Sequence, residues 1–101
     1  MTTKEVLTQA RDLIADKDAW TQGSLAADND GRAVDPKDRS AVSWCAEGAI
    51  ERVVPRRGTK LERDAGALLR GASGRVCASA FNDSKPHRSV IALFNRAIKA
   101  A

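Results

Sequence analysis

The chain has residue types for the three roles that thiol chemistry needs. Cys45 could provide a nucleophilic thiolate, His87 a base that activates it, and Asn82 or Asp83 a group that orients the base. The surroundings of Cys45 oppose this use, because apolar neighbours raise a thiol pKa and no glycine-rich oxyanion turn comes before it. A Cys-dependent hydrolase is kept as an alternative, and we predict no catalytic residue.

Metal and nucleotide chemistry have weaker support still. The chain has one histidine and two cysteines, Cys45 and Cys77, and their spacing matches neither CxxC nor HxxxH. The glycines are scattered and form neither a Walker loop nor a dinucleotide-binding fingerprint. We therefore predict no metal and no cofactor. Each cysteine falls on the apolar side of a predicted helix, so we expect two small buried residues and no disulfide.

Positive charge gathers in the second half of the chain. Residues 1–50 hold six Lys or Arg and nine Asp or Glu, a balance of −3, whereas residues 51–101 hold eleven and four, a balance of +7. Basic surfaces attract nucleic acids and acidic proteins, although such an excess can also serve only to solvate the chain. We predict that a partner contacts a basic surface made of Arg52, Arg56, Arg57, Lys60, Arg63, Arg70 and Arg75.

A protein is the favoured partner for this surface, and nucleic acid is the alternative. Arginines are frequent anchors of protein interfaces. The chain has no Tyr, two Phe and two Trp, so it offers few aromatic platforms on which single-stranded bases could stack. No helix-turn-helix pattern presents a recognition helix. The positive net charge also argues against mimicry of DNA, which requires an acidic surface.

Length and composition indicate one domain over residues 1–101. No apolar run approaches the ~18–20 residues that span a bilayer. The opening residues, MTTKEVL, lack the basic and apolar regions of a secretory signal. We expect a cytoplasmic protein with no membrane contact.

Local signals predict helices at both ends of the chain. Thr2 and Glu5 form a capping box before apolar residues at helical spacing, which predicts a helix from about Thr3 to Asp16. Near the C-terminus, the polar residues 82–84 are expected to cap an amphipathic helix with Pro86 in its first turn, and the Asn-Asp pair is the main candidate.

The apolar stretch Ser40–Val54 is predicted to form the central helix of the fold. Asp35-Pro36 leads into it, and Val54-Pro55 ends it, because a residue before proline is driven out of helical geometry. On its otherwise polar side, Trp44 and Gly48 lie one turn apart, a large ring beside a missing side chain. We predict that a second element packs there and that the helix is buried on two sides.

A β-hairpin is the expected second element. Short runs lie on either side of the Asp-Gly turn at residues 30–31. An isolated hairpin is not stable in water, so it needs a surface, and Trp44 with Gly48 could supply it with Trp20 alongside. Both tryptophans are expected to pack in the core.

Two shorter helices complete the predicted fold. A capping box at Thr59 and Glu62 predicts a third helix that ends near Gly71, and residues 76–81 fit a short fourth one. The fold class expected is mainly α (α+β), with four to five short helices around a central helix and one small β-hairpin.

Several short motifs give the chain a resemblance to a known family. They are Trp20-Thr21-x-Gly23, Ala26-x-Asp28-x-x-Gly31, Trp44-Cys45-Ala46-x-Gly48-Ala49 and Asn82-Asp83. With these motifs, nearly the whole chain resembles a family of small bacterial and bacteriophage proteins of unknown function. The resemblance implies a compact helical domain in a bacterial or phage setting. The chain departs from the family pattern at Phe81, where a tryptophan often stands, and at His87, where the family commonly has no histidine.

The function expected from these observations is that of a small non-catalytic binding or regulatory protein. Its basic surface would engage a macromolecular partner. The resemblance implies a more specific hypothesis, a phage or mobile-element counter-defence inhibitor of a host protein complex. Structural roles are expected for Trp20, Trp44, Cys45, Gly48, Asn82 and Asp83.

Overall fold

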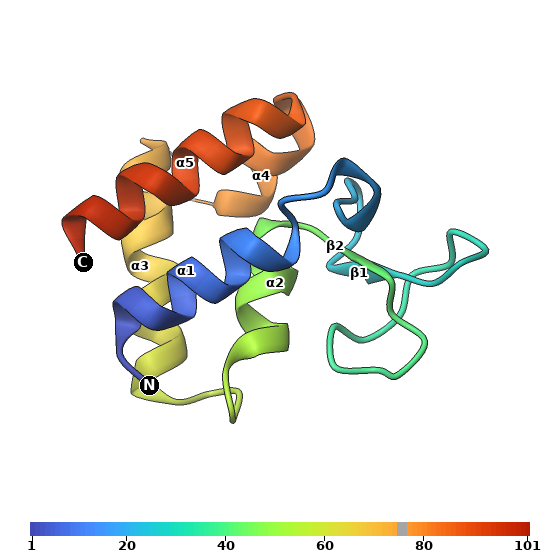
Figure 1. The fold of residues 1–101 in the computed structure, drawn as a ribbon, viewed down its shortest axis with the longest axis horizontal. Coiled ribbons are helices and arrows are strands. Elements are labelled where there is room, and N and C mark those ends of the chain that lie inside the picture. Colours follow the sequence, from blue (N-terminus) through green and yellow to red (C-terminus); the bar gives the residue numbers. More distant parts are fainter. Residues whose placement is uncertain (75–76) are drawn as a thin grey trace.

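The computed structural model describes residues 1–74 and 77–101 of the chain. This part contains five α-helices, a short 3-10 helix and a two-stranded antiparallel sheet (Figure 1). In chain order the elements are α1 (Thr3–Leu13), η1 (Lys17–Ala19), β1 (Ala26–Ala27), β2 (Ser43–Trp44), α2 (Ala46–Val53), α3 (Lys60–Ser73), α4 (Ala78–Ser84) and α5 (His87–Ala100). The predicted class, mainly α with one small hairpin, is confirmed.

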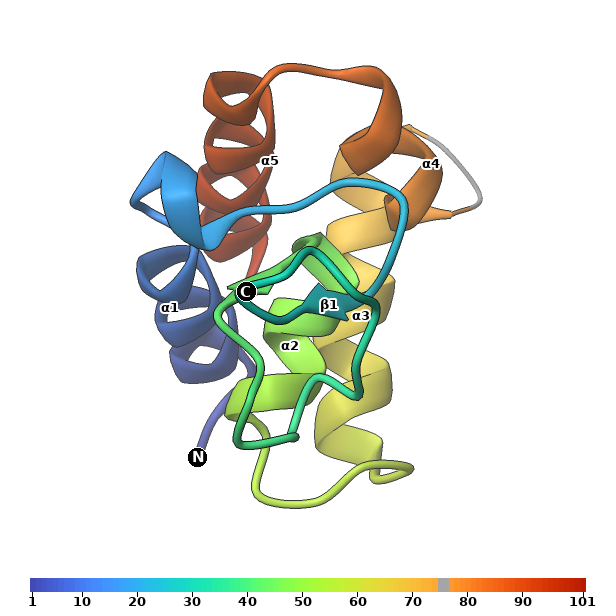
Figure 2. The ribbon, with the colours of Figure 1, turned by 90° about the vertical axis from the view of Figure 1, so that its right-hand side faces the viewer.

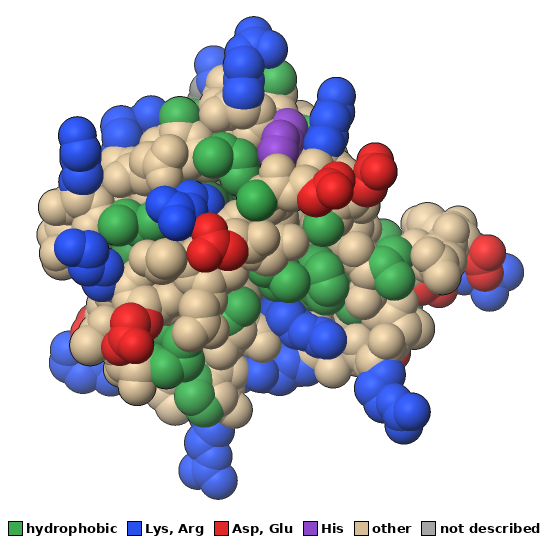
Figure 3. Space-filling view, viewed as in Figure 1, with side chains coloured by type: hydrophobic (Ala, Val, Ile, Leu, Met, Phe, Trp, Pro, Cys, Tyr) green, Lys and Arg blue, Asp and Glu red, His purple; other side chains and the backbone are tan. Residues whose placement is uncertain are grey.

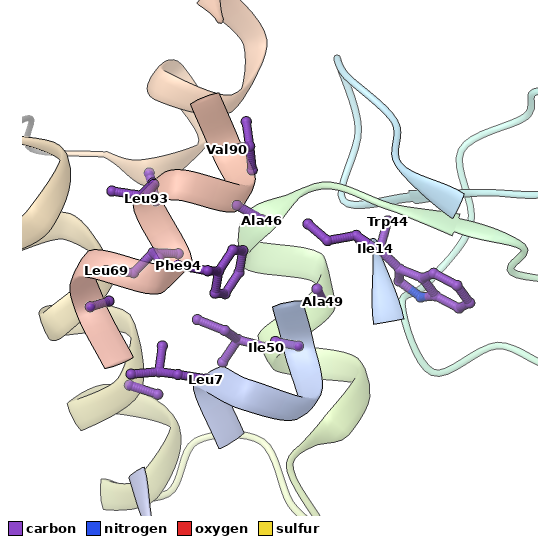
Figure 4. Packing of buried hydrophobic residues seen from close by; sticks show 14 of the residues in the cluster. Leu7, Ile14, Trp44, Ala46, Ala49, Ile50, Leu69, Val90, Leu93 and Phe94 are labelled. Carbon is purple, nitrogen blue, oxygen red and sulfur yellow. The ribbon is translucent and has the colours of Figure 1, made fainter. Parts of the chain in front are cut away.

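The apolar core lies between α1, α2, α3 and α5. Figure 4 shows Phe94 of α5 reaching toward α2, with Leu69 of α3 and Leu7 of α1 close by. These three side chains are completely buried. Burying a side chain of this size stabilises a fold by about 1.5–3 kcal/mol, so each of these residues contributes substantially to the stability of the bundle.

Local caps explain where two of the helices begin. In α1 the Thr2 hydroxyl accepts the Glu5 amide at 3.1 Å and the Glu5 carboxylate accepts the Thr2 amide at 2.9 Å, which confirms the capping box. The helix ends at Leu13, a few residues before the expected Asp16, which caps η1 instead. At α3, Thr59 caps as predicted.

The prediction for residues 40–54 was wrong in its first part. The helix begins only at Ala46, and residues 43–44 form a strand. The amide of Val42 donates to the carbonyl of Ala27 at 2.9 Å, and that of Cys45 donates to Leu25 at 3.1 Å. Sheet pairing thus satisfies backbone groups that a helix would otherwise satisfy, and a tertiary partner overrides the helical spacing. Asp35-Pro36 accordingly opens a series of turns and does not begin a helix.

The Asp-Gly turn is present and joins the runs expected on either side of it, with the amide of Val34 donating to the carbonyl of Ala26, but these runs pair over only a few residues. Gly31 has a φ of +78°, a conformation that favours glycine, and its amide donates to the carbonyl of Asp28. Beyond this turn only Ala33 forms a bridge, opposite Ala27. The regular pairing of β1 is with β2, ten or more residues further along the chain. Figure 2 shows the whole segment of residues 20–45 crossing in front of α2, between α1 and α3.

Two predictions near the C-terminus also need correction. Asn82 and Asp83 lie within α4 and do not cap α5, whose first turn follows Pro86 without a side-chain cap. Cys77 is exposed at the start of α4, because it stands before the first helical residue and not on the buried side. The predicted fourth helix included Val76, which lies outside the described residues.

Candidate functional site

The Cys45 thiol is a structural group at the start of α2. It is only 2% exposed, and its sulfur accepts the amide of Gly48 at 3.4 Å. Burial raises the pKa of this thiol to about 11, and the hydrogen bond from Gly48 opposes that rise only in part. A small cleft of about 160 Å³ borders the residue, lined also by Ser79 and Asp83. Because the thiol is neutral at physiological pH, it is a poor nucleophile.

The other groups of the possible thiol site have different partners. The Nε2 atom of His87 lies 2.7 Å from the carbonyl oxygen of Ile14. The centre of the His87 ring lies 5.4 Å from the centre of the Trp20 ring. The Asp83 carboxylate accepts the amide of Gly23 at 3.0 Å. Within the described part of the chain, no hydrogen bond joins Cys45 to His87 or His87 to Asp83. These residues therefore do not form the relay that a thiol hydrolase needs.

Asn82 is the most connected polar residue of the structure, and it is completely buried. Its side-chain oxygen accepts the Trp20 ring N–H at 2.7 Å and the Ala46 amide at 3.0 Å. Its side-chain nitrogen donates to the carbonyl of Thr21 and to Asp83, each at 3.0 Å. The amide thus makes all four of the hydrogen bonds open to it and ties α4 to α2 and to the segment 20–45. The Asn-Asp motif singled out residues 82–83, but no local signal in the sequence predicted which groups the Asn82 side chain would bond to.

Trp44 and Gly48 hold the same segment against α2 from a second direction. The Trp44 ring N–H donates to the carbonyl of Pro36 at 2.9 Å, and the Arg52 guanidinium lies 5.2 Å from the ring centre. A Cβ added at Gly48 would lie 1.8 Å from the carbonyl oxygen of Leu25. The predicted packing of a second element on Gly48 is therefore confirmed, although Trp44 contributes from a strand and not from the helix.

Most of the predicted basic surface is occupied by contacts within the chain. The Arg57 guanidinium contacts both carboxylate oxygens of Asp35. Its Nη1 atom also lies 3.6 Å from a carboxylate oxygen of Glu51. Lys60 pairs with Asp64 at 2.6 Å.

Two more of these side chains bind backbone carbonyls. Arg63 donates to Gly58, and Arg52 donates to Pro36 and Asp38. Arg56 and Arg70 are exposed and make no ion pair with any described residue. Arg75 lies outside the described residues. The proposed surface is therefore a mixture of positive and negative groups over residues 52–64.

A second hollow, of about 290 Å³, lies between α2 and α3. Three glutamates and two arginines line it, with Ile50 and Gly66 between them: Glu47, Glu51, Glu62, Arg63 and Arg70. Burial, followed by the nearby Glu62 charge, raises the pKa of Glu51. The mixed charges of its walls do not select one sign of ligand.

The described residues include no cluster of three His, Cys, Asp or Glu side chains that could hold a metal ion. No helix in this part of the chain has both the length and the apolarity that a membrane crossing requires.

The amino-acid sequence also matches a known protein family. Residues 1–100 match the model of a family of unknown function, DUF6197. The chain belongs to this family. No curated protein and no solved structure matches it. Membership in DUF6197 agrees with the expected resemblance to an uncharacterised domain and brings no activity with it.

Proposed function

We propose that the chain is a non-catalytic binding protein that engages an anionic macromolecular partner through a basic surface. The main support for this proposal is the charge balance of the C-terminal part of the chain. From residue 65 to the C-terminus the sequence has six Lys or Arg and a single acidic residue, Asp83. The carboxylate of Asp83 is already bound to Gly23 and Asn82. Among the described cations of this part, Arg70, Lys85, Arg88, Arg96 and Lys99, no ion pair neutralises the positive charge.

The arrangement of the thiol candidates supports binding over catalysis. Cys45 and Asn82 are buried and fully engaged in holding the fold together. In contrast, Arg88, Arg96 and Lys99 are exposed and make no ion pair with any described residue. Groups that are free to meet a partner are the ones a binding protein requires.

A more specific role follows from the resemblance to bacterial and bacteriophage proteins. In a cytoplasmic phage setting, a small basic protein of this kind could act as a counter-defence inhibitor of a host protein complex. This role stays a part of the proposal, and it rests on the resemblance alone.

Capture from a bacterial lysate tests the proposal. The purified chain, immobilised at low salt, is expected to retain a partner that elutes as the salt concentration rises. Nuclease treatment of half the lysate separates the two partner classes, because a nucleic-acid partner disappears and a protein partner remains. An unrelated basic protein of similar size and charge is the control. Retention of the same material by that control would overturn the proposal.

A further inference from the structure

We infer that the exposed face of α5 binds the phosphate backbone of double-stranded nucleic acid. This inference rests on the proposed function and names both the surface and the partner. The basic face, as we call it, consists of Arg88, Ala92, Asn95, Arg96 and Lys99, all of which are exposed.

Helix geometry places these residues together. At ~100° per residue, Arg88, Asn95 and Lys99 fall within about 40° of one another, and Arg96 lies about 60° further round. Arg88 and Lys99 are about 16 Å apart along the axis. The opposite side of α5 is fixed to the core through Val90, Leu93, Phe94 and Ala97, all completely buried. The three cations are therefore held on one rigid element.

The cations of this face are not neutralised by the protein. Residues 84–101 include no Asp or Glu. Arg88, Arg96 and Lys99 make no ion pair with any residue that the structure describes. In Figure 3, blue side chains project along the upper and left edges of the molecule, where Figure 1 shows α4 and α5. One further cation borders the face, since Arg11 donates to Asn95 at 3.1 Å while pairing with Asp12.

The same face lacks what a protein partner or a single strand would need. The large hydrophobic residues exposed in the described part of the chain are Met1, Leu25 and Val42, none of them on α5. A protein interface usually has an apolar or aromatic centre, which is missing here. Single strands are held by base stacking on aromatic rings. Trp44 is buried and Trp20 is bonded to Asn82, so neither ring is available on this surface. Phosphates on a duplex need only the cations.

Binding to a short fluorescein-labelled DNA duplex of mixed sequence tests the inference by fluorescence anisotropy. If three phosphates are neutralised, affinity should fall about 40-fold between about 50 and 200 mM salt. The triple variant R88E/R96E/K99E should lose at least about tenfold in affinity at the lower salt, and its salt dependence should be nearly flat. Duplexes of unrelated sequence should bind equally well.

A matched control separates the location of the charge from its amount. The triple variant K4E/R32E/R39E changes the net charge equally but lies on other exposed positions, and it should bind within about twofold of wild type. Should a triple reversal unfold the chain by circular dichroism, R88A/R96A/K99A replaces it, and weaker binding is again expected.

Two results would overturn the inference. In the first, R88E/R96E/K99E binds the duplex as tightly as wild type while K4E/R32E/R39E does not, so that the basic surface lies elsewhere and the proposed function stands. In the second, wild type does not bind the duplex at low salt. The lysate capture then decides separately whether the proposed function fails as well, since a protein retained after nuclease treatment would preserve it.

Discussion

The helical bundle and the segment 20–45 are held in place by different forces. The bundle of α1, α2, α3 and α5 is joined by apolar side chains such as Phe94, Leu69 and Leu7. The segment has only two-residue strands, and its buried contribution to the apolar core is small, consisting of Ala26, Ala41 and Trp44. It is anchored by the buried hydrogen bonds of Asn82, by the Trp44 ring N–H and by the close approach of Leu25 to Gly48.

The two regions are therefore expected to respond differently to substitutions. Apolar packing has little directional preference, so the bundle can relax in part around an altered side chain, at a cost in stability but with no polar group left unsatisfied. A buried hydrogen bond or a backbone contact with no spare space cannot adjust in this way, and losing one partner leaves the other group unsatisfied. We therefore expect single substitutions at the anchors to release the segment while the bundle persists.

The largest effect is expected from Gly48→Ala. The new methyl group would lie 1.8 Å from the Leu25 carbonyl oxygen, so backbone must move, and the free energy of unfolding should fall by about 3 kcal/mol or more. Urea denaturation measures this change. Gly71→Ala is the control, because nothing lies within 4 Å of its added Cβ, and it should stabilise α3 by up to about 1 kcal/mol. Equal stability of the two variants would show that the segment does not press on α2.

Asn82→Leu should have the next largest effect. It leaves the Trp20 ring N–H and the Ala46 amide without their acceptor, which should cost about 2–4 kcal/mol. Hydrogen exchange should then become faster in residues 20–45 and stay slow in α1 and α5.

Two control variants test whether this exchange pattern is specific to the loss of the Asn82 hydrogen bonds. Leu69→Ala opens a cavity in the bundle at a similar cost of about 2–5 kcal/mol, and it should speed exchange throughout the chain. Gln9→Leu, an amide-to-leucine change at an exposed position of α1, should change stability by less than about 0.5 kcal/mol. If Asn82→Leu and Leu69→Ala gave the same exchange pattern, the distinction between the two regions would be wrong.

The two cysteines should differ strongly in reactivity. With a pKa of about 11, only about one Cys45 thiol in a thousand is ionised at pH 8, and the residue is buried as well. Cys77 is exposed, so a thiol reagent should label the native chain at Cys77 first, as mass spectrometry can show. Cys45→Ala should lower stability by about 1 kcal/mol. Rapid native labelling of Cys45 would instead indicate an accessible thiolate and reopen the hydrolase alternative.

The smallest effect is expected at the Asp35–Arg57 pair, which joins the segment to the loop before α3. The hydrogen bonds from Arg57 lower the pKa of Asp35, with a further contribution from the Lys37 amide. A lowered carboxyl pKa stabilises the fold above the unfolded pKa, and this contribution is lost as the pH falls through the folded value. Asp35→Asn should therefore be slightly less stable than wild type at pH 7, and the difference should disappear as the pH falls through the folded pKa of Asp35.

Urea midpoints across this pH range measure the difference. The exposed Asp30 makes no ion pair with a described residue, so Asp30→Asn should show no such convergence. A difference that persisted for Asp35→Asn at low pH would contradict an electrostatic origin.

Local signals in the sequence were enough to locate α1, α3, α5 and the end of α2, but not the start of α2. The Thr2–Glu5 capping box and the apolar side of α5 involve residues within a few positions of one another, so their interactions are present whenever the helix forms. Gly48 could also be recognised, because a glycine inside a helical pattern suggests close approach by another element.

The segment 20–45 and the basic face depended on tertiary structure. Asn82 meets Trp20 and Ala46 across 62 and 36 positions of sequence, and residues 43–44 leave the helical pattern because Ala26 and Ala27 pair with them. In the same way, charge counts identified a basic half, but only the fold showed that residues 52–64 carry neutralising partners while α5 does not. The physical reason is that pairing of backbone, amide and charge is settled between groups distant in sequence, whereas caps and helical periodicity act between near neighbours.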